Sequence, residues 1–191
     1  GTLTRGKPTL VRVLPFGLSQ EEALRLAAAL ERGSEHPLAK AVLEAAESLP
    51  QAQAEEVRAL PGEGVEGRVE GRRLHLGGPA LMERLGVPLP EEAKALPEEG
   101  YTPLYLVEGT RLLAAFAVFD PPRPEAQEAV AALKALGLKL VLLTGDHPAP
   151  ARRVAEALGI PEVLAGVRPE GKVEAIRRLQ AEGRKVVFVG D

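Results

Sequence analysis

The chain has 191 residues, of which 45% are hydrophobic and 27% charged, and its net charge is −3. This balance is typical of a globular protein of one or two domains and excludes a disordered or fibrous chain. Basic residues alternate with acidic ones instead of forming a stripe, so nucleic acid is not an expected partner. The sequence lacks cysteine, which excludes disulfides, thiolate metal sites and cysteine nucleophiles. The longest apolar run, residues 112–119, is of strand length, so we expect a soluble chain in the cytoplasm.

The first 119 residues predict an antiparallel sheet with helices. Residues 9–16 alternate like a strand, and residues 19–33 follow as a helix that begins with a Ser19/Glu22 capping box. A second helix starts at Pro37. From Glu55 onward the hydrophobic period changes to two, and glycine turns separate short predicted strands at 55–60, 64–71, 72–78, 102–109 and 110–119. About six strands are therefore expected in this half.

The pattern changes at the proline-rich segment 120–126, which is the predicted domain boundary. Helical segments then alternate with short apolar strands, and this alternation predicts a parallel sheet. The predicted strands are 139–145, 161–166 and 185–191. Ligands in such sheets bind at the carboxyl ends of the strands. Two of these ends carry an aspartate.

Three side chains in this second half are suited to phosphoryl chemistry. Asp146 and Asp191 each follow a glycine at a predicted strand end, where a carboxylate can bind Mg²⁺. Lys172, near the start of a predicted helix, can neutralise a phosphoryl oxygen. Each also has a plain structural interpretation, because such aspartates often cap helices or form turns and a helical lysine is commonly a solvated surface residue.

Two further features lie in the first half. Gly62, Gly64 and Gly67 match the spacing of a dinucleotide-binding fingerprint, but strand residues follow them where that fingerprint requires a helix. They therefore predict either a hairpin turn or a glycine floor on which a ligand approaches the backbone. Glu31 and His36 flank a tight turn between helices, so both can face one pocket, although a helix cap is the simpler interpretation of His36. No histidine has a partner at metal-ligand spacing, so no transition-metal site is expected.

Several segments, taken in chain order, resemble the cytoplasmic head of P-type ATPases. They are GTLTRGKP (1–8), ERGSEHPL (31–38), PGEG (61–64), DPPRPEA (120–126), TGD (144–146), Lys172 and VVFVGD (186–191). The SEHPL element is typical of the heavy-metal subgroup and favours copper over zinc or cadmium. The resemblance spans nearly the whole chain.

The resemblance implies an α/β fold with two domains. A phosphorylation domain of haloacid-dehalogenase type, built on a parallel sheet, would comprise residues 1–8 and 120–191. A nucleotide-binding domain, an α+β insertion with an antiparallel sheet of about six strands flanked by helices, would comprise residues 9–119. The same resemblance implies ATP and Mg²⁺ as cofactors. It makes the chain a cytoplasmic part of an integral membrane protein, with transmembrane and actuator domains as partners and a heavy-metal ion bound elsewhere in that protein.

Nucleotide contacts in the first half follow from the resemblance. Glu31, His36, Gly62 and Gly64 fall on ATP-binding positions, with the histidine near the adenine and the glycines where the backbone meets the nucleotide. We therefore interpret His36 mainly as an ATP-positioning residue that also caps a helix. The subgroup usually has asparagine where this chain has Gly78, so one side-chain contact is absent and a lower affinity is expected.

Roles in the second half follow in the same way. Asp120 and Asp146 fall on the nucleotide-facing hinge side and are expected to contact the nucleotide. Thr144 would hydrogen-bond the transferred phosphoryl group, and Lys172 would neutralise its charge. Asp191 would hold Mg²⁺. Thr144, Lys172 and Asp191 are thus the expected catalytic residues.

The family signature reads Asp-Lys-Thr-Gly-Thr, and this chain starts at its glycine, so the phosphorylated aspartate would lie three residues before Gly1. We expect that the chain as given cannot autophosphorylate. The leading hypothesis is the ATP-binding and phosphorylation head of a copper(I)-exporting pump, which couples ATP hydrolysis to transport through an aspartyl phosphate. Two alternatives are an ATP-binding module without turnover and a stand-alone phosphatase of the dehalogenase type.

Overall fold

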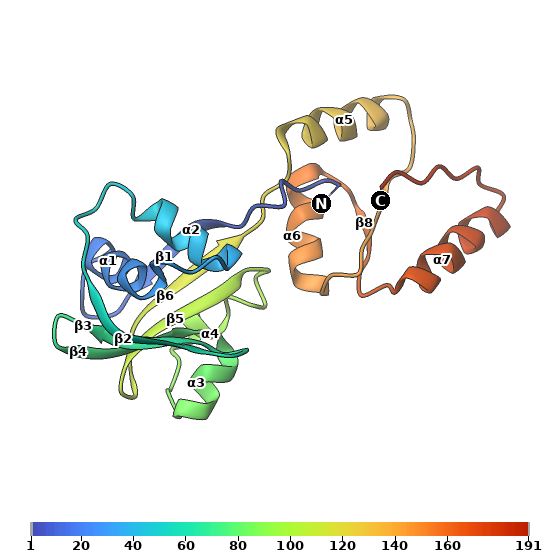
Figure 1. The fold of residues 1–191 in the computed structure, drawn as a ribbon. Helices are drawn as coiled ribbons and strands as arrows, with labels where there is room; N and C mark the ends of the chain where they lie inside the picture. Colours follow the sequence, from blue (N-terminus) through green and yellow to red (C-terminus); the bar gives the residue numbers. More distant parts are fainter. Residues whose placement is uncertain (1, 191) are drawn as a thin grey trace. The chain divides into compact units, whose positions relative to one another are not determined.

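The computed structural model describes residues 2–190 and divides into two compact units (Figure 1). The insert unit is the continuous segment Lys7–Phe119. The split unit combines Gly1–Gly6 with Asp120–Asp191. The assignment of a nucleotide-binding and a phosphorylation domain to these units stays a prediction.

The insert unit is built on one six-stranded antiparallel sheet with the strand order β1-β6-β5-β4-β3-β2. Its strands are β1 (Thr9–Pro15), β2 (Ala54–Leu60), β3 (Gly64–Val69), β4 (Arg72–Gly77), β5 (Thr102–Glu108) and β6 (Arg111–Phe119). The predicted antiparallel sheet of about six strands is therefore confirmed. The central strands β5 and β6 are apolar along almost their whole length, because both of their faces are buried.

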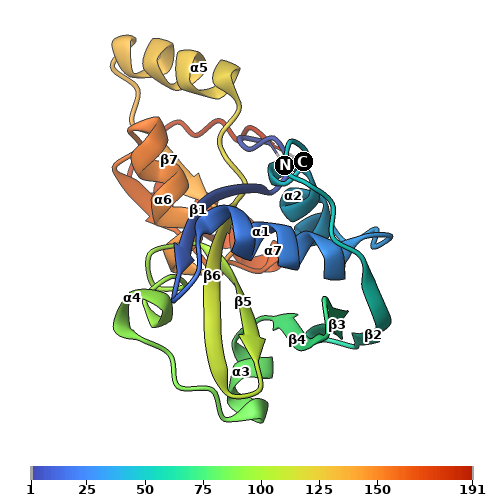
Figure 2. The ribbon, with the colours of Figure 1, turned by 90° about the vertical axis from the view of Figure 1, so that its left-hand side faces the viewer.

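Helices cover both faces of this sheet (Figure 2). They are α1 (Gln20–Glu31) and α2 (Pro37–Ala45) on one face, and α3 (Pro79–Leu85) and α4 (Glu91–Lys94) on the other. Leu30 and Phe116 are among the buried side chains beneath α1 and α2. On the opposite face Leu81 packs in the same core cluster as Tyr105, whose hydroxyl donates a hydrogen bond of 2.8 Å to the Ala93 carbonyl. The sheet thus lies between two apolar cores.

Helix α1 begins as the sequence predicts, with one difference. The Ser19 hydroxyl accepts a 3.1 Å hydrogen bond from the Glu22 backbone N–H. The Glu22 carboxylate, however, accepts hydrogen bonds from Arg25 instead of completing the capping box. Arg25 also binds Glu70, in the turn between β3 and β4, through two hydrogen bonds of 2.7 and 3.0 Å. The arginine therefore fastens α1 to this hairpin.

The split unit has a smaller hydrophobic core than the insert unit. Its parallel strands are β7 (Val141–Leu143) and β8 (Glu162–Leu164), and its helices are α5 (Pro124–Ala135), α6 (Pro148–Leu158) and α7 (Pro169–Ala181). The buried cluster joins α5 to α6 and to the residues just after α6; its members are Ala126, Val130, Ala155, Leu158 and Ile160. Helix α7 has no buried residue. The parallel βαβ pattern predicted for this half is present, but the sheet is narrow.

The strand predicted at 185–191 is wrong for the residues that the structure describes, 185–190. Residues 185–190 have no regular secondary structure, and Val187 and Val189 are 87% and 77% exposed. The apolar sequence suits a buried strand, but a strand needs a neighbour for its hydrogen bonds, and none of residues 2–190 pairs with this segment. Within the same range, no helix has the length and apolar character needed to span a bilayer.

Candidate nucleotide and phosphoryl site

The turn between α1 and α2 holds Glu31 and His36 at its two ends. The Ser34 backbone N–H donates to the Glu31 carbonyl at 3.0 Å. The Ser34 hydroxyl in turn accepts from the His36 backbone N–H at 3.3 Å. These bonds make the turn compact, so its two ends are fixed by local backbone geometry.

His36 caps helix α2. Its Nδ1 atom accepts a 3.2 Å hydrogen bond from the Leu38 backbone N–H, and Pro37 occupies the first helical position. Because Nδ1 is the acceptor, a neutral imidazole carries its proton on Nε2. The ring is exposed, so Nε2 and the ring face are available to a ligand. The capping role is confirmed, whereas the contact with adenine stays a prediction.

Glu31 ends α1 as a half-buried carboxyl group. Burial raises its pKa from the ordinary 4.5 to about 7. No side chain or backbone group among residues 2–190 donates a hydrogen bond to its carboxylate or pairs with it. A carboxyl group that is desolvated without compensation is characteristic of functional sites.

The glycines in and beside the β2–β3 hairpin have different reasons to be glycine. A Cβ atom on Gly64 would overlap the Leu76 carbonyl oxygen, and one on Gly77 would overlap the carbonyl oxygen of Glu63. Gly64 and Gly77 pair in the β3–β4 register, so the two backbones touch where side chains would otherwise stand. Gly62 has a φ of 74°, which favours glycine. Gly62 lies in the turn between β2 and β3 and has open space beside it, whereas Gly64 and Gly77 allow the two paired backbones to approach closely.

Gly78 lacks any such constraint. Its φ is −87°, and no atom lies within 4 Å of a Cβ built on it. An asparagine at this position would therefore fit the backbone.

Packing brings the end of α1 onto the strand that starts at Gly64. A Cβ on Gly67, in the middle of β3, would lie only 2.9 Å from Cδ2 of Leu30, the residue before Glu31. A larger residue at 67 would therefore require Leu30 to shift. Glu31 and the glycine hairpin therefore belong to one region of the insert unit. The sequence did not reveal the roles of Gly67 and Gly77, although the glycine spacing along the hairpin is the signal that could have found them.

In the split unit, Thr144 and Asp146 lie in one turn after β7. The Asp146 backbone N–H donates to the Thr144 hydroxyl at 3.1 Å. The Thr144 carbonyl accepts from Val167 at 3.0 Å, so the segment that leads into α7 is fixed beside it. Lys172 lies in the first turns of that helix, with its backbone N–H bonded to the Arg168 carbonyl. The structure thus connects Thr144, Asp146 and the start of α7.

Asp120 lies where the chain re-enters the split unit. Its Oδ2 atom accepts a 3.2 Å hydrogen bond from the Gly6 backbone N–H. Thr4 and Pro122 form a β-bridge next to it, and Arg123 Nε donates to the Thr4 carbonyl at 2.9 Å. Asp120 therefore joins the two crossing segments of the chain. Asp191 lies outside the described residues.

The described residues contain no group of three His, Asp or Glu side chains that could hold a metal ion by themselves. Mg²⁺ in phosphoryl-transfer sites, however, is commonly held by one or two carboxylates together with phosphate oxygens and water. Among residues 2–190, the Asp146 carboxylate has no recorded partner and stands at a strand end. The residues present therefore fit a magnesium–nucleotide complex, in which phosphate supplies ligands, and do not fit a metal ion bound by protein alone.

Comparison with known families and proteins gives one consistent result. The whole chain, residues 1–191, matches the haloacid dehalogenase-like hydrolases. It is 42% identical over 197 residues to copper-transporting ATPase 1 of Rhizobium meliloti (strain 1021) and 39% identical over 193 residues to copper-exporting P-type ATPase B of Archaeoglobus fulgidus. Both alignments cover 100% of this chain, but only 24% and 28% of those relatives. The chain thus spans about a quarter of the length of the curated relatives it matches.

Solved structures agree in fold. A zinc-transporting PIB-type ATPase in its E2.Pi state is 38% identical, with a TM-score of 0.83 over 95% of this chain and 30% of its own. The catalytic domain of a CPx-ATPase, a structure solved in a study of conformational changes on nucleotide binding, is 26% identical, with a TM-score of 0.70 over 100% of this chain and 68% of its own. The α/β fold class is therefore confirmed.

Proposed function

Because this chain belongs to the haloacid dehalogenase-like hydrolase family and resembles copper-transporting P-type ATPases over its whole length, we propose that it is the ATP-binding and phosphorylation head of a heavy-metal pump. The insert unit would bind ATP, and the split unit would carry the phosphoryl chemistry. The ion would be copper(I), since relatives at 39–42% identity are named as copper transporters. The head would lie in the cytoplasm and work with transmembrane and actuator domains.

The observation that carries this proposal is the pairing of an unpartnered, desolvated carboxyl with an oriented imidazole at one turn. The cap holds the His36 ring by Nδ1, so the exposed ring can stack on or bond to a nucleobase without reorganising. With its pKa at about 7, Glu31 is partly protonated at neutral pH. It can then donate to a ring nitrogen or accept from an amino group, and its charge repels the phosphates less than an ordinary glutamate would.

The bare hairpin backbone supports the same proposal. Gly62 has no Cβ in this turn, and no atom lies within 4 Å of the place where one would stand, so the backbone beside it is open to a ligand. Backbone N–H groups can therefore meet a nucleotide at close range, as in other glycine-rich nucleotide sites. Gly78 would lack the side-chain contact of the usual asparagine, so ATP affinity would be lower than in proteins with asparagine there.

In the split unit, we assign Thr144 and Lys172 to the transferred phosphoryl group. The Thr144 hydroxyl accepts from the Asp146 N–H, which orients it and leaves its own proton free to donate to a phosphoryl oxygen. The Lys172 ammonium would neutralise charge on the same group. Mg²⁺, when bound with the phosphates, would supply further charge neutralisation, with Asp146 and Asp191 as its carboxylates. Asp120 would position the nucleotide-facing hinge through its bond to Gly6.

The covalent step requires an aspartate carboxylate ahead of Gly1. Its oxygen would attack the γ-phosphorus of ATP, the bond to the ADP oxygen would break, and water would later hydrolyse the acyl phosphate. In the family that this chain resembles, Gly190-Asp191 would begin a GDGxND loop. A chain extended by Asp-Lys-Thr at its start and by the rest of that loop at its end should acquire acid-stable, Mg²⁺-dependent label from ATP. No label in such a chain would contradict this assignment. Hydrolysis of small phosphate esters without nucleotide binding would favour the stand-alone phosphatase.

Calorimetric titration with ATP tests the nucleotide site. We expect His36→Ala to weaken ATP binding about tenfold or more, because the stacked or bonded ring is lost. Alanine also removes the helix cap, so His36→Asn is the sharper variant, since asparagine keeps a capping acceptor without the ring. His147→Ala is the matched control: His147 precedes Pro148 at the start of α6 but makes no side-chain cap. Unchanged affinity in both His36 variants would overturn the proposal.

A further inference from the structure

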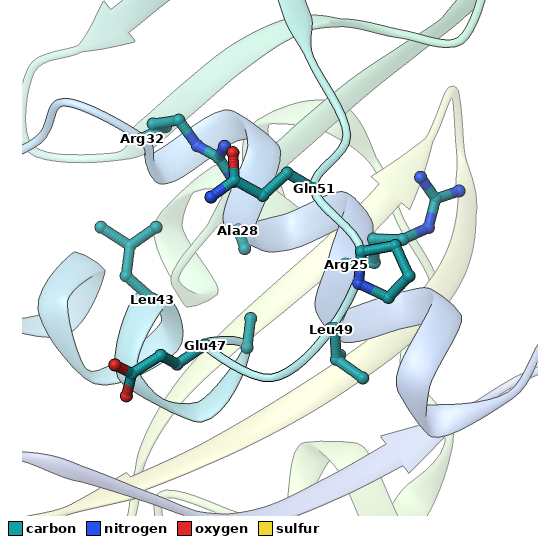
Figure 3. A pocket seen from close by; sticks show the side chains of 9 residues that line it. Arg25, Ala28, Arg32, Leu43, Glu47, Leu49 and Gln51 are labelled. Atoms are coloured by element: carbon teal, nitrogen blue, oxygen red, sulfur yellow. The ribbon is translucent and has the colours of Figure 1, made fainter.

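A cavity of about 290 Å³ opens between α1, α2 and the segment that returns from α2 to the sheet (Figure 3). Ala28 from α1, Leu43 from α2 and Leu49 from the return segment contribute apolar walls. Arg32 and Gln51 supply polar groups. Its volume is at the small end of the range for ligand pockets. None of the proposed nucleotide contacts, Glu31, His36 and the glycines, lines it.

The two arginines that line the cavity differ in what their guanidinium groups do. Arg25 is fully engaged by Glu22 and Glu70 and contributes mainly its aliphatic stem. Arg32 has no recorded hydrogen bond or ion pair with any of residues 2–190. In Figure 3 its guanidinium lies toward the Gln51 side chain. The cavity therefore has a free cation and an amide beside each other.

The Glu47 carboxylate also lines this cavity, and it points away from Arg32 in Figure 3. A negative charge at that position disfavours a ligand with several negative charges, such as a polyphosphate. A ligand with one anionic end and an apolar body matches the arrangement better. A guanidinium binds a carboxylate through two parallel hydrogen bonds, and the Gln51 amide can add a third.

We propose that this cavity binds a small monocarboxylate with a short apolar chain. The carboxylate would lie against Arg32 and Gln51, and the chain would lie between Ala28, Leu43 and Leu49. This site is separate from the proposed ATP site and uses different side chains.

The test is a titration of the full chain with sodium hexanoate, followed by methyl and amide NMR. We expect saturable shifts at the methyl groups of Leu43 and Leu49. Arg32→Gln should weaken binding about tenfold, because a charge-assisted pair becomes a neutral contact. Hexanol, which has the same chain without the charge, should bind correspondingly worse to the unaltered protein. Arg73→Gln is the control, because Arg73 is an exposed arginine outside the cavity.

Three results would overturn this inference. They are the absence of saturable shifts, equal hexanoate affinity in the Arg32→Gln chain, and equal affinity for hexanol. A parallel titration with ATP separates this inference from the proposed function. If both the monocarboxylate cavity and the proposed ATP site are correct, saturating ATP leaves the hexanoate shifts in place. Displacement of hexanoate by ATP would show that the two ligands share a site, and would refute the separate pocket.

Discussion

The insert and split units differ in how much of their sheets they bury. In the insert unit, apolar side chains on both faces of six strands lie under helices, and Leu106 and Phe116 are fully buried. In the split unit, two strands of three residues support one small cluster, and α7 buries nothing. Among residues 2–190, the insert unit also contains most of the ion pairs, including the double pair of Arg25.

The difference follows from strand connectivity. Antiparallel strands that are joined by short turns find their partners locally, whereas parallel strands need crossover helices and several neighbours to be covered on both faces. The candidate nucleotide residues therefore lie at helix ends and in a hairpin of a unit whose sheet is buried on both faces. The candidate phosphoryl residues stand on turns whose support comes from fewer contacts.

The largest expected effect comes from replacing a buried leucine by alanine in each of the two units. Leu106→Ala in the insert unit should lower the free energy of unfolding of that unit by about 3–5 kcal/mol, because a fully buried leucine leaves a cavity that tight packing cannot close. Leu158→Ala in the split unit should cost about 2 kcal/mol or less, since its smaller cluster can relax. Denaturant unfolding followed by NMR, with separate signals for each unit, measures both.

Equal losses from the two substitutions would contradict the contrast. A control is Val11→Ala on the edge strand β1, where the side chain is 48% exposed. This change should alter stability by less than about 0.5 kcal/mol.

A smaller effect concerns pH and belongs to the insert unit alone. Below pH 4.5 the Glu31 carboxyl is protonated in both the folded and the unfolded chain and has no effect. Between 4.5 and about 7 the unfolded chain ionises first, so the stability of the insert unit should fall as pH rises and level off above 7. The change should be on the order of 1 kcal/mol after allowance for its partial exposure.

Glu31→Gln should remove this slope, because an amide does not titrate. Glu35→Gln, a change at an exposed glutamate in the same turn, is the matched control and should keep it. Unfolding curves at pH 5, 6, 7 and 8 for the three chains provide the measurement. A slope that survives in Glu31→Gln would show that another group carries it.

Local patterns predicted the insert unit well. The period of two, the glycine turn between the strands predicted at 102–109 and 110–119, and the Ser19 cap each depend on neighbours in sequence, and each appears in the structure. Helix α3 was not located from the sequence, because this helix is short and follows a glycine that provides no side-chain cap. The strand at 185–191 was predicted from composition, but composition does not supply a hydrogen-bonding neighbour.

The candidate site was only partly visible in the sequence. The spacing of Glu31 and His36 indicated a shared turn, and the cap by His36 follows from its position before Pro37. The burial of Glu31 could not be predicted, because it depends on tertiary packing at the end of α1, where the preceding residue, Leu30, lies against Gly67, which is distant in sequence. Tertiary packing, and not local pattern, sets the pKa of this carboxyl group.

The most direct test of the ATP-binding head is the map of amide shifts that ATP produces in the full chain. We predict saturable shifts in the insert unit, in the α1–α2 turn around Glu31 and His36 and in the hairpin at Gly62–Gly64. Shifts confined to the split unit, or none at millimolar ATP, would contradict the account.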